Sequence, residues 1–446
     1  MAKLAEAILD RRVQSPNYFE GRLLTAEDLT AERTAQFHRQ RILGRAIGAG
    51  VVCGLWVDED ATASATAPRV TISAGEALTP EGQILTLEND LTLTLSDVAP
   101  ADETSPDACL FKPCTPPETE SVATGEGFYL LTMSPVSRFE ASAPMQSLSE
   151  TKAGRGCGKR WAVPGVSFRL VPFDPLNVPN PNAATAEALA SLLSGPLNTR
   201  GRSRLRNIVA HLCFGSDEIA DFVADPYAQE DGVPRLRHYG TVDYLRALDV
   251  LSGCELPLAA IYWTTQGLTF VDCWSVRREA TPGPVSRTWP SLPGQRLVRE
   301  NHARLLQFQH QLAQVIAATG FPSTLRAREY FRYLPAAGLL PLATTTRVGP
   351  TAETFFAAHP ARRPVEYING EQLRGAIERS YALDPIDLDG EEMLWLYRSW
   401  QQDPAQDAGR TDRAHLMFTS PHMPPLNIPR FDVARWEYAN FPSSPL

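Results

Sequence analysis

The sequence predicts an α+β protein. We expect an N-terminal helix with a small antiparallel β-sandwich, an α+β middle domain, and a mixed C-terminal region with one long helix. Three observations predict this: a capped helical pattern after Thr25, alternating apolar residues between 69 and 95, and a periodic apolar pattern over 297–319. The 446 residues exceed the roughly 250 to 300 at which single cores stop growing, so several domains are expected. We place them at 1–100 (docking domain), 101–127 (linker), 128–290 (middle domain) and 291–446 (C-terminal domain with an extended tail).

The first helix is predicted to begin at Thr25. Its hydroxyl can cap the helix, and Asp28, three residues on, can return a hydrogen bond to the cap's own backbone N–H. The helix body mixes an uneven apolar stripe with many charged side chains, so part of it should meet a polar or charged surface. Gly48 and Gly50 end it.

Short strands should follow the helix. We expect one over 51–57, where Gly54 indicates a bulge or a close approach of another backbone, and four more between 70 and 95. Pro80-Glu81-Gly82 is typical of the turn between two of them, because proline sets φ and glycine allows a positive φ.

The middle region alternates strands, loops and helices. Strands are predicted at 128–133 and 166–171, with a long polar loop over 138–160 between them. A helix is predicted at 183–193, a buried apolar segment at 205–212, and a strand pair at 256–263 and 268–274.

The second clear helix covers 297–319. Its apolar seam is either that of an ordinary core helix or that of a helix on a trimer axis; the seam residues are Leu305, Phe308, Leu312 and Val315. Gly320 should end the helix. A helix near 370–381, strands near 393–397 and 415–418, and a proline- and aromatic-rich tail that lies extended on another surface complete the expected order.

Several short motifs resemble a family of uncharacterised proteins encoded in gene clusters of phage-tail-like contractile injection systems. They include Tyr18-Phe19-Glu20-Gly21, the arginines of the first helix, the 50–55 segment GVVCGL, DCWSVRR at 272–278, and YFRYLPAAGLLP at 330–341. Over about the first 95 residues, the order of motifs is also similar to the start of TssK, the type VI secretion baseplate subunit. Here Pro80-Glu81-Gly82 replaces Pro-Asp-Gly, and no tryptophan precedes Gly50.

This resemblance implies a structural baseplate or tail-associated subunit. Such a subunit forms a homotrimer, binds other baseplate and tail proteins, and links the baseplate to a fibre or an anchoring partner. The candidate interface residues are Tyr18, Phe19, Glu20, Arg33, Arg41, Arg45, Arg277, Arg278, Tyr330 and Phe331. For Arg277 and Arg278, bidentate pairs across a domain or subunit boundary compete with a simple solvated face.

Composition narrows the functional classes. A net charge of -9 gives no support to nucleic-acid binding. No run of 18 apolar residues and no signal-peptide pattern occurs, so we expect a cytoplasmic protein, assembled into a tail-like particle, that does not insert into membranes. Most of the seven cysteines should be buried thiols; Cys109, Cys114 and Cys157 are a weaker candidate for zinc.

No catalytic motif stands out, so we predict no enzyme activity, no cofactor and no metal. His211 and Cys213, if on a strand, are neighbours rather than a catalytic pair. The segment DPIDLDGEE at 384–392 suggests either part of a calcium loop or a solvated acidic turn.

Two alternative functions remain open. One is a carbohydrate- or receptor-binding module with an aromatic platform of Trp289, Tyr330, Tyr333 and Trp436. The other is a hydrolase of envelope polymers that uses a carboxylate pair such as Glu140 and Asp174.

Overall fold

The protein is described here by a computed structural model. The structure describes residues 13–60, 62–65, 67–96, 126–144, 157–178, 181–217, 229–230, 233–234, 240–280, 295–341, 349–357, 359, 362–400 and 415–420. The predicted α+β class is confirmed, because helices and small, mostly antiparallel sheets occur throughout these ranges. No helix in the described part of the chain is both long and apolar enough to cross a membrane.

The N-terminal part consists of α1 (Ala26–Ile47) and two three-stranded sheets. The first sheet has the order β1-β4-β5, and the second has the order β2-β3-β6. The bounds are β1 (Gly50–Gly54), β2 (Val57–Glu59), β3 (Arg69–Ile72), β4 (Gly75–Leu78), β5 (Ile84–Leu87) and β6 (Leu91–Thr94).

The single strand expected over 51–57 is instead two strands. Leu55 has a φ of 56°, so the chain turns there from the first sheet into the second. The close approach predicted at Gly54 is confirmed, because a Cβ there would lie 1.9 Å from the Ala74 carbonyl oxygen. Only glycine fits this crossing point.

The middle part is built on a four-stranded sheet of order β12-β11-β7-β8. Its strands are β7 (Gly127–Pro144), β8 (Cys157–Phe173), β11 (Leu256–Thr264) and β12 (Gly267–Asp272), and the other elements are α2 (Ala183–Leu193), α3 (Thr199–Phe214), β9 (Gln229–Glu230), β10 (Val233–Pro234) and α5 (Thr241–Ala247). The loop predicted over 138–160 was too long, because β7 and β8 pair as far as Pro144 and Cys157. The 205–212 segment belongs to a helix, so the strand considered for His211 and Cys213 was wrong.

The C-terminal part packs a long helix against a mixed sheet of order β14-β18-β17-β15. Only the β15–β17 pair in this sheet is parallel. The bounds are α6 (Gln295–Thr319), α7 (Ala327–Tyr330), β13 (Tyr333–Leu334), β14 (Ala337–Pro341), α8 (Ala352–Phe355), β15 (Arg362–Asn369), α9 (Gly370–Ser380), β16 (Ile386–Asp387), β17 (Leu394–Trp400) and β18 (His415–Thr419).

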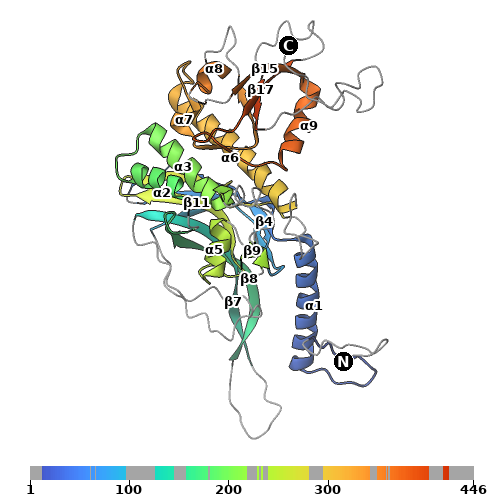
Figure 1. Cartoon of the computed structure of the whole chain (residues 1–446). Coiled ribbons are helices and arrows are strands. Elements are labelled where there is room, and N and C mark those ends of the chain that lie inside the picture. The colour runs from blue at the N-terminus through green and yellow to red at the C-terminus, as the bar shows by residue number, and fades with distance from the viewer. Residues whose placement is uncertain are drawn as a thin grey trace, which may run out of the picture.

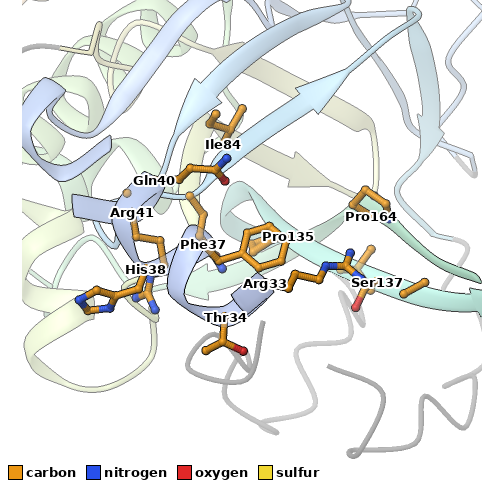
Figure 2. A pocket seen from close by; sticks show the side chains of 15 residues that line it. Arg33, Thr34, Phe37, His38, Gln40, Arg41, Ile84, Pro135, Ser137 and Pro164 are labelled. Atoms are coloured by element: carbon orange, nitrogen blue, oxygen red, sulfur yellow. The ribbon is translucent and has the colours of Figure 1, made fainter. Parts of the chain in front are cut away.

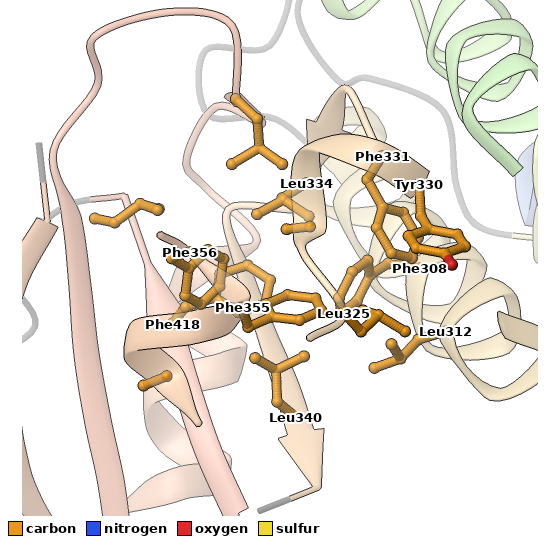
Figure 3. Packing of buried hydrophobic residues seen from close by; sticks show 14 of the residues in the cluster. Phe308, Leu312, Leu325, Tyr330, Phe331, Leu334, Leu340, Phe355, Phe356 and Phe418 are labelled. Carbon is orange, nitrogen blue, oxygen red and sulfur yellow. The ribbon is translucent and has the colours of Figure 1, made fainter. Parts of the chain in front are cut away.

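Three main apolar clusters hold these parts together. One joins both N-terminal sheets to the β7–β11 region of the middle sheet, and a second lies between that sheet and the helices α2, α3 and α5. The third packs α6 against the C-terminal sheet (Figure 3). All four seam residues of α6 are buried within the chain, which confirms the core-helix interpretation rather than the trimer-axis one.

Two elements stand away from this body. Figure 1 shows α1 and the β7–β8 hairpin side by side at one end of the molecule, with the C-terminal sheet at the other end. The candidate functional site lies between these two elements.

Candidate functional site

Local hydrogen bonds hold the start of α1. The Thr25 hydroxyl accepts from the Asp28 backbone N–H at 3.2 Å, and the Asp28 carboxylate accepts from the Thr25 backbone N–H at 3.1 Å, so the predicted capping box is confirmed. Arg22 also pairs with Asp28. The hydrogen bonds from Thr25, with the charge of Arg22 adding to them, lower the pKa of the Asp28 carboxyl and keep it ionised at the positive end of the helix.

The C-terminal half of α1 is held by the turn between β4 and β5. Gly44 faces Gly82 so closely that a Cβ on Gly44 would lie 2.2 Å from the Gly82 carbonyl oxygen. Beside this contact, the Arg41 guanidinium donates to a Glu81 carboxylate oxygen at 2.6 Å and to the Glu81 carbonyl at 3.3 Å. The predicted turn at Pro80-Glu81-Gly82 therefore packs against α1 and holds it in position.

A groove of about 330 Å³ separates α1 from the hairpin (Figure 2). Six residues of α1 line one wall, Gly82, Gln83 and Ile84 line the base, and the hairpin supplies the other wall. The hairpin residues are Pro135, Val136, Ser137, Ala162, Pro164 and Gly165. Figure 2 shows Phe37 and Arg33 on the helix side of this space and Pro135 and Pro164 on the hairpin side.

Large apolar side chains are exposed on α1, at the base of the groove and on the hairpin. On α1 only Ala35 and Gly44 are buried, whereas Leu29, Ile42, Leu43 and Ile47 are between 46% and 64% exposed. Ile84 at the base and Trp161 on the hairpin are also more than half exposed. These exposed apolar side chains are candidates for a protein-protein contact.

The candidate residues of the N-terminal part lie on this end of the molecule. Tyr18 and Phe19 are 54% and 64% exposed, and Glu20, Arg33 and Arg45 are also exposed. Arg41 is half-buried because it holds the turn. These six remain candidates for contact with a partner.

Arg277 is buried and Arg278 is half-buried. The Arg277 guanidinium donates to the Gly54 carbonyl at 2.8 Å and stacks on the Trp56 ring at 3.8 Å, which ties the N-terminal part to the middle part. Arg278 donates to the carbonyls of Trp274, Ser275 and Arg277, and its burial lowers its pKa to about 10. The solvated-face interpretation is therefore wrong for Arg277, which bonds across the boundary between the N-terminal and middle parts, and the half-buried Arg278 is held by backbone carbonyls.

The other two candidate interface residues are also internal. Tyr330 and Phe331 are 5% and 0% exposed and belong to the cluster under α6 (Figure 3). They support the fold and offer no external contact. Tyr333 is likewise buried, so an aromatic platform containing Tyr330 and Tyr333 is excluded; Trp289 and Trp436 lie outside the described residues.

The proposed hydrolase pair is too far apart to act together. Glu140 pairs with Trp161 in the hairpin, and Asp174 follows the opposite end of β8, where Phe173 pairs with Phe128. At about 3.3 Å per residue the two carboxylates are roughly 40 Å apart along the ladder, against about 5 to 10 Å in glycosidases.

The described residues contain no cluster of His, Cys, Asp and Glu that could hold a metal ion. Cys109 and Cys114 lie outside the described residues, as does the side chain of Cys157. Cys213 and Cys273 are buried free thiols, as predicted, whereas Cys53 is exposed and Cys254 is disulfide-bonded. Burial raises the pKa of both buried thiols to about 12, so neither is a reactive thiolate.

The acidic turn at 384–392 is bound to arginines and is partly exposed to solvent. Asp389 accepts from Arg204 of α3 at 2.6 Å and from Arg328 at 3.1 Å, and Asp387 lies 3.4 Å from Arg332. An ion-pair network that joins the middle and C-terminal parts thereby replaces the calcium loop, and the solvated-turn interpretation holds for the exposed Asp389, Glu391 and Glu392.

Sequence reasoning missed the groove itself. Its walls come from residues about 100 positions apart, and neither Pro135 nor Pro164 belongs to a recognisable motif. The one available signal was the excess of apolar and arginine side chains on α1, which predicted a polar or charged contact without its location.

Comparisons with known proteins add a weak likeness. No family model and no curated protein matches the chain. Among solved structures, a crystal structure of TssK matches with 12% identity and a TM-score of 0.20, over 35% of this chain and 34% of TssK. The chain therefore spans about a third of that protein's length.

Two further matches are baseplate assemblies of the type VI secretion system. The TssK-TssF-TssG subcomplex matches with 13% identity and a TM-score of 0.20, over 48% of this chain and 79% of that one. The baseplate complex matches with 11% identity and a TM-score of 0.19, over 50% and 71% respectively. These likenesses are too weak to show a shared fold.

Proposed function

We propose that this protein is a structural subunit of a phage-tail-like contractile injection apparatus, located in or on the baseplate. One observation carries the proposal: α1 has 22 residues, of which two are buried, and it projects from the body with four large apolar side chains exposed. Full burial of one such side chain stabilises a contact by roughly 1.5 to 3 kcal/mol. A helix of this kind is completed by a neighbouring protein.

The arrangement favours a linking role. The docking end, formed by α1 and the hairpin, lies opposite the C-terminal sheet (Figure 1). In this proposal the docking end binds other baseplate or tail proteins, and the C-terminal end extends toward a fibre or an anchoring partner. The domain limits given above, a homotrimeric state and assembly of a cytoplasmic protein into the particle belong to the same proposal.

The resemblance of the motifs at 18–55, 272–278 and 330–341 to proteins of injection-system gene clusters supports this choice of apparatus. Binding of a carbohydrate has less support, because two of its four proposed platform residues are buried. A hydrolase has less support as well, since its proposed carboxylates lie at opposite ends of the hairpin.

The test is to fractionate the contractile particles of the producing cells and to follow the chain by mass spectrometry. We expect the chain to co-sediment with the particle, and the double variant Leu43→Ser/Ile47→Ser to lose most of this association. Met393→Ser, at an exposed apolar residue of the C-terminal part, is the matched control. Purified protein should form trimers near three times 49.0 kDa by light scattering. A chain absent from the particle contradicts the proposal.

A further inference from the structure

The wall of the groove that α1 forms is positively charged. From Arg33 to Ile47 the helix carries four arginines and no acidic residue, although the whole chain has a net charge of -9. The lining includes Arg33, Arg41 and His38, and no Asp or Glu among its described residues. An occupant of this groove meets positive charge along one wall.

The four arginines of this stretch differ in whether they already have an acidic partner. Arg41 is held by Glu81, whereas Arg33 stacks on Phe37 at 5.4 Å and has no acidic partner in the part of the chain that the structure describes. Arg39 and Arg45 are also exposed and unpaired within that part. Arg39 and Arg45 lie outside the lining, so the α1 wall of the groove offers the Arg33 guanidinium to pair with a carboxylate.

The remaining lining is apolar, and it disfavours an added strand. Beside Phe37 and Ile84, the hairpin wall contributes Pro135, Val136 and Pro164. β8 is the edge strand of its sheet, and Pro164 has no backbone N–H to donate to a further strand. A helix needs no such hydrogen bonds from its partner, because its own backbone groups are satisfied internally.

We propose that this groove binds an amphipathic helix of another protein of the particle, with its apolar side chains on Phe37 and Ile84 and with acidic residues facing Arg33. The stretch of α1 from Arg33 to Arg45 is about 18 Å long, which matches roughly three turns of a partner helix. The partner is thus recognised by two features together: apolar residues at three- and four-residue spacing, and carboxylates along one flank.

The experiment uses the purified full chain and two synthetic peptides of 14 residues. Both peptides carry leucines at helical spacing; one has glutamates along the flank and the other has lysines. Binding is measured by fluorescence anisotropy at low and high salt. We expect the acidic peptide to bind at least ten-fold more tightly than the basic one, and more weakly as salt rises.

Variants of the chain make the test specific. Arg33→Glu should weaken the acidic peptide about ten-fold and should strengthen the lysine peptide, a reversal that a general loss of folding cannot produce. Ile84→Asp, at a side chain that is 68% exposed, should weaken both peptides. Arg374→Glu on α9, whose side chain is 89% exposed, is the matched charge control and should change nothing.

Three outcomes overturn the inference: neither peptide binds, both bind equally at low salt, or a single-stranded oligonucleotide binds through Arg33 in their place. The inference rests on the proposed function, because it takes the occupant from the same particle. The two proposals can be told apart by experiment. A chain that co-sediments with particles but binds neither peptide contradicts the helix-binding groove and leaves the proposed function standing.

Discussion

Gly44 and Gly82 meet backbone to backbone where α1 rests on the turn between β4 and β5. A Cβ added to Gly82 would lie 2.1 Å from the Arg41 carbonyl oxygen, and one added to Gly44 would lie 2.2 Å from the Gly82 carbonyl oxygen. Backbone atoms on both sides cannot turn away as a side chain would. The position of the projecting helix, and so the width of the groove, depends on these two glycines.

Gly82→Ala should therefore disrupt the contact between α1 and the turn that joins β4 to β5. Gly82 has a φ of +82°, which costs an alanine about 1 kcal/mol, and the clash with Arg41 adds roughly 1 to 3 kcal/mol. Gly21→Ala is the matched control, because Gly21 has a φ of +84° and nothing within 4 Å of its Cβ position. Urea unfolding should show a clearly larger loss for Gly82→Ala; equal losses would mean that the contact does not constrain the helix.

Phe308 should be the most costly side chain to remove from α6. It is fully buried and lies 5.1 Å from Phe331 and 5.4 Å from Phe418, ring centre to ring centre (Figure 3). Phe308→Ala should lower the free energy of unfolding by about 3 to 5 kcal/mol. Val298→Ala, on the same helix but 38% exposed, should cost less than about 1 kcal/mol. If the two variants unfold at the same urea concentration, α6 is not the core helix described here.

The features predicted correctly from sequence are local ones. The capping box of Thr25 and Asp28 and the turn at Pro80-Glu81-Gly82 depend on residues at most three positions apart. The seam of α6 was also predicted, because apolar spacing alone determines which face of a helix is buried.

Contacts between distant segments were predicted poorly. For Arg277 the sequence allowed both a solvated face and a pair across a boundary, because its acceptor Gly54 lies 223 positions away. The ion pair of Asp389 with Arg204 was not predicted, because the two residues lie 185 positions apart. Residue type alone favours exposure for charged side chains, and only the fold supplies the partners that allow their burial.

Asp389 should stabilise the junction between α3 and the C-terminal part. It accepts hydrogen bonds from Arg204 and Arg328, and although burial raises its pKa, the charge of Arg204 and these bonds lower it overall. Asp389→Asn should cost about 1 to 2 kcal/mol, and less at high salt because the pair is partly exposed. The nearby Glu391→Gln, at an exposed carboxylate that forms no ion pair with the residues the structure describes, controls for net charge. A loss that does not change with salt would show that charge is not its cause.

The buried pair of Arg206 and Asp272 should make the free energy of unfolding depend on pH. The Arg206 Nε donates to Asp272 at 2.6 Å, and both side chains are at most 5% exposed. Burial raises the pKa of Asp272, but Arg206, Gln307 and the Ser275 N–H outweigh it and lower the pKa overall. The contribution is thus present above the unfolded pKa of about 3.9 and is lost as the pH falls below it. Asp272→Asn should cost roughly 3 to 5 kcal/mol near neutral pH, because Arg206 stays buried without its partner, and should flatten the decline in stability below about pH 4. Arg206→Met/Asp272→Leu should cost less than Asp272→Asn in urea unfolding; the opposite order would show that the pair itself, rather than the uncompensated charge, stabilises this junction.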